Sequence, residues 1–385
     1  MASSNISLNT TDEVNQDLIS NLPPIATEKI LKFLPIKMAA SMSVLSTKWK
    51  DNWLSLRHLV FDRTFWEEIM RGSQPPQDNY VAEKTIIIVS NILLHHNGPL
   101  QKFLFSVPPR FVLNPPPRDF KGFADLRSLK LDRIECKPDI FGSLIASCPR
   151  LTLLKLVHCI GLRHVIINIP SLESLVIIGV LDYLSFKNVA SLTYISLLEV
   201  YKIPRGKTEV VDSFKDLATS CQLQHLHFGG DQFLATGGVA KSFPLTFNHL
   251  SKLCLTELNL GRPDVYRFVF RMIPSCPYIK ELEISMALIA YFAFDENALP
   301  LQKHEYDDDN FKMRHLLKVI VTDIRGSLAE LEFIKYVLAI SVMLEKFFFK
   351  LYGYFSGDNS KNLVLLNLLQ LPRASPKAQL VYLKQ

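Results

Sequence analysis

The chain has 385 residues, a formal net charge of +6, and 48% hydrophobic residues. That length allows two or three domains with a large buried core. The positive charges form no dense basic run, which argues against nucleic-acid binding. The longest charge-free apolar runs, 85–94 and 284–294, are shorter than the ~20 residues that cross a bilayer, so we expect no membrane association.

Residues 1–16 are predicted to be a disordered tail. The first eleven are polar and lack the charged start and apolar centre of a signal peptide, so we expect a cytoplasmic or nuclear protein. The six cysteines include no Cys-x-x-Cys pair. We therefore expect free thiols, without a zinc site, a redox dithiol or a cofactor.

The first predicted folded segment spans 17–62. Pro23 and Pro24 fix φ and delay a helix, so Thr27 is the expected N-cap of a short helix over 28–33. Pro35 should end that helix, because a proline disfavours the α conformation in the residue before it.

A second helical pattern follows in the same segment. Apolar residues recur there at steps of three and four, which places them on one face of a helix. They are Met38, Met42, Leu45, Trp49 and Trp53. So small a unit has too much surface to bury all of this apolar area, which must therefore pack on the chain's own repeats or on another protein.

The spacing of several short motifs resembles a known domain. The motifs are Asp17-x-Ile19-Ser20-x-Leu22-Pro23, Ile30-Leu31-x-x-Leu34-Pro35-x-Lys37, Ser43-Val44-Leu45-Ser46-x-x-Trp49, Trp53, and Leu59-x-Phe61-Asp62. Together they resemble the F-box of plant F-box proteins with leucine-rich repeats. Three polar positions depart from the family pattern, where Met38 replaces an acid and Ser41 and Lys48 replace Arg.

The F-box resemblance implies a binding partner. In that family the F-box binds a Skp-family adaptor, which links it to a cullin ubiquitin ligase. The residues expected to bind the adaptor are Leu22, Pro23, Ile30, Leu31, Leu34, Pro35, Val44, Leu45, Trp49 and Trp53.

Residues 63–310 repeat a template, Leu-x-x-Leu-x-Leu. The copies are Leu126/Leu129/Leu131, Leu151/Leu154/Leu156, Leu172/Leu175/Ile177, Leu192/Ile195/Leu197, Leu223/Leu226/Phe228, Leu255/Leu258/Leu260 and Ile279/Leu282/Ile284, with weaker copies at Leu56/Leu59/Phe61 and Leu100/Phe103/Phe105. Most steps fall in the range of 20–29 residues that is typical of leucine-rich repeats. We therefore predict an α/β solenoid with a parallel sheet on the concave face and helices on the convex face.

Two convex helices are marked by the same signals. Segments 138–147 and 263–273 both begin with Pro-Asp and both end next to Ser-Cys-Pro, which suits a helix start and a helix end. Segment 210–219, followed by Cys221, is predicted to be a third copy.

Residues 311–385 resemble the FBD segment that follows the repeats in the same plant family. The resemblance includes Ala329 to Leu338 and the ending Arg373-Ala374-Ser375-Pro376. The segment is expected to contain two more repeat strands, an amphipathic helix over 328–338, and a tail from Asn362 that caps the solenoid. A cap is needed because an end strand exposes unpaired backbone groups.

The residue between the last two apolar positions of each template must point away from the core, onto the concave face. These residues are chemically mixed, as suits a protein target. They are Lys130, Lys155, Val176, Ser196, His227, Asn259 and Glu283, followed by Ile320 and Phe348.

Catalytic motifs are incomplete. Gly206-Lys207-Thr208 lacks the upstream glycine of a phosphate loop, and Asp307-x-Asp309 lacks the rest of a calcium loop. His225 and His227 share a strand face but have no evident third metal ligand. Together with the repeats, the F-box resemblance implies a substrate receptor of an SCF-type (Skp-cullin-F-box) ubiquitin ligase, and the incomplete motifs lead us to expect that it is non-catalytic. A non-ligase scaffold or inhibitor, and a solenoid enzyme or ligand receptor, are the alternatives.

Overall fold

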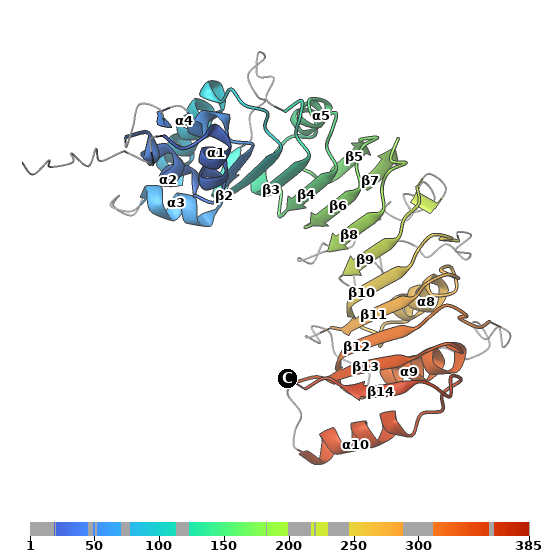
Figure 1. The fold of residues 1–385 in the computed structure, drawn as a ribbon. Coiled ribbons are helices and arrows are strands. Elements are labelled where there is room, and N and C mark those ends of the chain that lie inside the picture. Colours follow the sequence, from blue (N-terminus) through green and yellow to red (C-terminus); the bar gives the residue numbers. More distant parts are fainter. Residues whose placement is uncertain are drawn as a thin grey trace, which may run out of the picture.

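The computed structural model describes residues 19, 21–44, 49–50, 52–70, 78–112, 123–181, 183–198, 217–218, 221–229, 246–287, 311–353 and 358–384. The predictions for the tail 1–16, for Leu45, and for most of the helix at 210–219 lie outside these residues. Figure 1 shows the strands side by side along an arc, with the first helices at one end and the helix before the last strand at the other.

One twelve-stranded sheet runs the length of the molecule, and every neighbouring pair of strands in it is parallel. Its strands, in spatial order, are β1 (His58–Phe61), β2 (Lys102–Val112), β3 (Ser128–Glu135), β4 (Leu153–Val157), β6 (Ser174–Ile178), β8 (Tyr194–Leu198), β9 (His225–Gly229), β10 (Lys252–Leu258), β11 (Glu281–Met286), β12 (Lys318–Ile324), β13 (Lys346–Leu351) and β14 (Gln379–Tyr382).

The template leucines form the core of this sheet. Leu129, Leu154 and Leu175, which pair across β3, β4 and β6, are each 0% exposed. Stacking identical positions of successive repeats buries one continuous apolar row, which an isolated repeat cannot do. The structure therefore confirms the predicted α/β leucine-rich-repeat solenoid.

Helices occupy the connections at both ends of the solenoid. They are α3 (Arg63–Met70) and α4 (Asp78–His95) between β1 and β2, α5 (Pro138–Ala146) after β3, α8 (Pro263–Met272) after β10, α9 (Leu328–Ile340) after β12, and α10 (Asp358–Leu369) after β13. Both Pro-Asp segments are helices with the proline in the first turn, as predicted.

The middle of the convex side differs from the prediction of helices. There β5 (His164–Asn168) and β7 (Tyr183–Lys187) form a separate two-stranded parallel sheet. These repeats are among the shortest, since Leu151, Leu172 and Leu192 are only 21 and 20 residues apart. So short a connection leaves little room for a helix, and both segments alternate buried and exposed residues as a half-buried strand does.

The register of β10 corrects one template assignment. The core of that strand is Leu253 and Leu255, and Cys254 pairs with His227 and Glu283 on either side. Asn259 follows the strand and is not in that row. The error arose because two overlapping copies of the template, at 250–255 and 255–260, share Leu255.

The N-terminal helices also differ from the prediction. Helix α1 (Pro24–Lys32) starts four residues earlier than expected, with Pro23 as its N-cap and Pro24 in its first turn. Proline is tolerated there because the first backbone N–H groups of a helix have no partner within it. Thr27 lies inside the helix and its hydroxyl donates to the Pro23 carbonyl at 3.3 Å.

The second predicted helical face is not a single helix. Helix α2 (Ile36–Ser41) is followed by a 3-10 turn at Met42–Val44 and by another at Asn52–Ser55. These elements surround a small core made of Leu31, Ala39, Trp49 and Leu56. Ile36 lies instead in the core of the repeats, so the N-terminal helices are packed directly onto the solenoid.

A tight turn joins β12 to α9 and contacts α10. Gly326 in this turn has φ +86°, and a Cβ at this position would collide with the side chain of Val364 in α10. We expect Gly326→Ala to lower the free energy of unfolding by about 1–3 kcal/mol in urea titrations. Gly142→Ala is the matched control, because a Cβ there meets no atom within 4 Å and removing a mid-helix glycine should stabilise by about 0.5–1 kcal/mol.

Candidate protein-binding surfaces

The N-terminal helices expose a set of large apolar side chains. We call this set the F-box apolar surface; it consists of Ile19, Ile25, Ile30, Phe33, Met38 and Val44. Phe33 is 84% exposed and Val44 is 89% exposed. Such a concentration of exposed apolar groups within one short segment is typical of an interaction site.

The residues predicted to bind an adaptor divide into three groups. Pro23, Ile30, Pro35 and Val44 are exposed, whereas Leu22, Leu34 and Trp53 are half-buried against the small core. Leu31 and Trp49 are 1% and 2% exposed, and the Trp49 indole donates to the Ile19 carbonyl at 3.2 Å. These two residues therefore support the surface from inside.

The predicted adaptor-binding set omitted four exposed apolar residues, which are Ile19, Ile25, Phe33 and Met38. Phe33 is the C-cap of α1, immediately before Leu34 and Pro35. A large aromatic at the end of a helix whose buried face is Thr27 and Leu31 must point elsewhere. Only this burial pattern, which the sequence does not show, identifies Phe33 as a surface residue.

An aromatic cluster packs where β1, α3 and β2 meet, at the N-terminal end of the sheet. Phe61 in β1 contacts the rings of Phe65, Trp66, Phe103 and Phe105 at centroid distances of 5.1–6.3 Å. The Trp66 indole also donates to the carbonyl of Ser106 in β2 at 2.6 Å. These contacts tie the first strand of the sheet to α3 and to β2.

The concave face carries the second candidate surface. Strand register places one central row of residues across the sheet, and the row includes every predicted target-binding position except Asn259. It runs Lys130, Lys155, Val176, Ser196, His227, Cys254, Glu283, Ile320 and Phe348.

A hydrogen-bonded ladder occupies the middle of this row. His227 contacts Ser196 through Nδ1 at 3.3 Å and Thr256 through Nε2 at 3.2 Å. Burial lowers the pKa of His227; the charge of Glu283 opposes this shift, and that of Lys252 adds to it. Because Ser196 is only 3% exposed, we interpret this ladder as structural, with His227 as the part that a target can reach.

The strands on the C-terminal side of the ladder carry paired charges. Lys252 lies 3.3 Å from Glu281 and 3.2 Å from Glu283, and Lys318 lies 3.2 Å from Glu281. Burial opposes ionisation of Glu281, but the bonds from the two lysines outweigh it and lower its pKa. These two lysines and two glutamates compensate one another's charge.

The described residues contain no group of three or more His, Cys, Asp or Glu placed to hold a metal ion. His227 is engaged by Ser196 and Thr256. None of the helices within the described ranges is long and apolar enough to span a bilayer. The F-box apolar surface and the concave face are extended surfaces of the kind that contact other proteins.

Comparison with known proteins agrees with this arrangement. The F-box domain profile matches residues 19–61, and a profile described as FBD-associated F-box protein At5g56370, LRR repeats, matches residues 103–215. F-box/FBD/LRR-repeat protein At1g13570 of Arabidopsis thaliana is 28% identical over 431 residues, which cover 96% of this chain and 99% of that protein. The chain therefore resembles plant F-box/FBD/leucine-rich-repeat proteins along nearly its whole length.

Other relatives match shorter parts of the chain. F-box/LRR-repeat protein At3g59200 of the same plant is 37% identical over 93 residues, or 24% of this chain and 17% of that protein. F-box/FBD/LRR-repeat protein At2g04230, also from Arabidopsis thaliana, is 44% identical over 55 residues, covering 14% of this chain and 12% of that protein. The F-box match at 19–61 contains all six residues of the F-box apolar surface.

Proposed function

We propose that this chain is the substrate-recognition subunit of an SCF-type ubiquitin ligase. The observation that carries the proposal is the F-box apolar surface, which coincides with the F-box match and is not covered by any described part of the chain. A Skp-family adaptor would cover that surface, and through it a cullin-RING ligase would be recruited. The concave face would bind a protein target.

The proposed contribution of this subunit is proximity. Ubiquitin transfer would be carried out by other subunits, while this chain raises the effective concentration of target lysines near the charged conjugating enzyme. The incomplete motifs and the protein-binding geometry support a non-catalytic role. We expect it to act in the cytoplasm or the nucleus.

The proposal predicts that Phe33→Ala weakens adaptor binding by about tenfold or more, because an exposed aromatic in an interface is a typical energetic anchor. Binding of the purified adaptor to the full chain is measured by calorimetry. Phe33 is a sharper test than Leu22 or Leu34, whose half-buried side chains also support the F-box core.

Tyr278→Ala is the matched control, since Tyr278 is an exposed aromatic far along the solenoid, next to β11. It should leave adaptor affinity unchanged. If wild-type chain fails to bind the adaptor while still capturing target proteins, the alternative of a non-ligase scaffold or inhibitor replaces the ligase proposal.

A further inference from the structure

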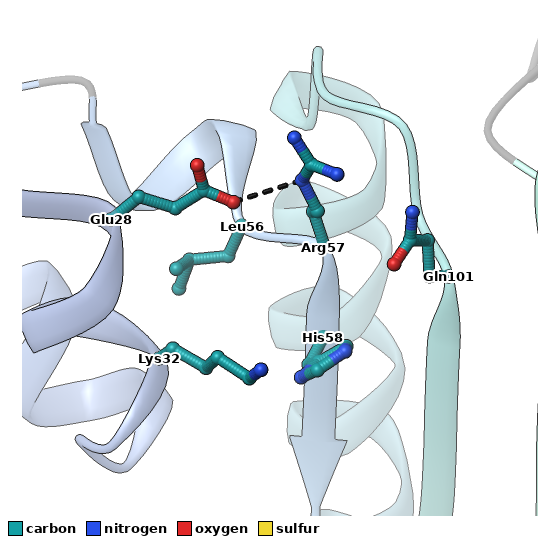
Figure 2. A pocket seen from close by; sticks show the side chains of 6 residues that line it. All are labelled: Glu28, Lys32, Leu56, Arg57, His58 and Gln101. Carbon is teal, nitrogen blue, oxygen red and sulfur yellow. Dashed lines mark ion pairs between the residues drawn. The ribbon is translucent and has the colours of Figure 1, made fainter. Parts of the chain in front are cut away.

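A small cavity lies where the F-box meets the first strands of the solenoid, and we call it the junction cavity. It has a volume of about 190 Å³ and is lined by Glu28 and Lys32 of α1, by Leu56, Arg57 and His58 at the start of β1, and by Gln101 just before β2. Figure 2 shows the Lys32 and His58 side chains directed toward the same space, beside the ion pair of Arg57 with Glu28. The cavity therefore joins two separate parts of the fold.

Positive charge around the junction cavity exceeds negative charge. Lys32 and Arg57 line it, and Lys102 at the start of β2 is close enough to act on His58. Glu28 is the one acid among the lining residues, and its carboxylate is 2.8 Å from Arg57 Nε. In the described part of the chain, neither Lys32 nor Lys102 forms an ion pair.

The pKa of His58 is affected by the same excess of positive charge. Burial lowers its pKa most, the charges of Lys32, Lys102 and Arg57 lower it further, and Glu28 acts in the opposite direction. A dianion placed among these groups would relieve the repulsion between them. The ion pair of Glu28 with Arg57 shows that an anionic oxygen is already accommodated at this wall.

The size of the junction cavity limits the ligand. A volume of 190 Å³ corresponds to roughly six water molecules at about 30 Å³ each. It is smaller than the ~300 Å³ or more of a site that encloses a drug-sized ligand. A tetrahedral oxyanion fits this volume, and guanidinium, ammonium and imidazolium groups are its usual protein partners.

We propose that the junction cavity binds the tetrahedral dianion of phosphate or of a small phosphate ester, held by Lys32, Arg57 and His58. Bound there, the anion bridges α1 of the F-box to the strands of the solenoid. It would thereby stiffen the connection between the two proposed binding surfaces. The inference is independent of the ligase proposal, because it concerns the chain alone.

Calorimetric titration of the full chain with sodium phosphate, at constant ionic strength, tests the site. We expect saturable binding that weakens about fivefold in Lys32→Gln, since one partly exposed cation is lost. Glu28→Gln should instead tighten binding by a few-fold, because it removes the competing carboxylate. A variant that gains affinity cannot be explained by misfolding.

Lys29→Gln is the matched control, an exposed lysine of the same helix that does not line the cavity. It should bind phosphate like the wild type. Absence of saturable binding, equal losses in Lys32→Gln and Lys29→Gln, or weaker binding by Glu28→Gln would each overturn the proposal. Parallel titrations with O-phosphoserine distinguish a site that admits a phosphate ester from one that admits only the free ion.

A pH series with sulfate tests the role of His58. Sulfate remains a dianion between pH 5.5 and 7.5, so the charge of the ligand does not change across this range. Protonation of His58 adds positive charge as the pH falls through this range, so sulfate affinity should rise toward pH 5.5. His58→Gln should bind sulfate with little pH dependence. A wild type without pH dependence, or a His58→Gln variant that retains it, would exclude His58 from the site.

Discussion

Phe61→Ala is expected to lower the free energy of unfolding by about 3–5 kcal/mol, the usual cost of truncating a fully buried phenylalanine. Phe61 is 0% exposed, and its ring contacts four other aromatic rings, two from α3 and two from β2. The cavity left behind cannot close easily, because Trp66 is fixed by its hydrogen bond to the Ser106 carbonyl. Urea unfolding followed by circular dichroism measures the loss.

Val60→Ala is the control for Phe61→Ala. Val60 is the neighbouring residue of the same strand, but it is only half-buried on the opposite face. Its truncation should cost much less than that of Phe61. Similar losses in the two variants would show that the aromatic cluster does not anchor this end of the solenoid.

Glu330→Ala is expected to cost about 2–4 kcal/mol of unfolding free energy. Glu330 is 7% exposed, and its Oε2 accepts hydrogen bonds from the backbone N–H groups of Arg325, Gly326 and Ser327 at 2.8–3.0 Å. The Ser327 hydroxyl accepts in turn from the Glu330 N–H, which completes a capping box at the start of α9. Alanine would leave the turn's donors without this acceptor.

Glu330→Gln separates the hydrogen bonds from the charge. Burial raises the pKa of Glu330, with the three N–H groups acting in the opposite direction, so the site partly disfavours the ionised form. A neutral amide oxygen can still accept the three bonds, and we expect Gln to lose about 1 kcal/mol or less. If Gln is as destabilising as Ala in urea titrations, then charge and not acceptor geometry holds the turn.

The sheet was predictable from the sequence because its core has a strict local period. Residues two apart on a strand share a face, so each copy of the template identified its own buried pair. The prediction was wrong at Asn259, where overlapping copies permit two registers and only pairing with His227 and Glu283 selects Cys254. It was also wrong for the helices expected around β5 and β7, because the short repeats left too few residues for them.

The binding surfaces were less predictable than the sheet. Apolar spacing in the F-box identified a helical unit but not which side chains it buries, so Trp49 and Phe33 have opposite exposures that depend on tertiary packing. The junction cavity has no local sequence signal. Its residues come from 28–32, 56–58 and 101, and only the docking of α1 beside β1 and β2 brings them together.

The connection between β8 and β9 shows how this architecture tolerates variation. Residue 198 ends one strand and residue 225 begins the next, yet the two pair in register from Tyr194 with His225 to Leu198 with Gly229. In general, each doubling of the length of a connection between strands costs only about 0.6 kcal/mol of closure entropy. Related proteins can therefore differ in the length and sequence of this connection, and with it in binding preference, while the buried apolar rows of the sheet stay the same.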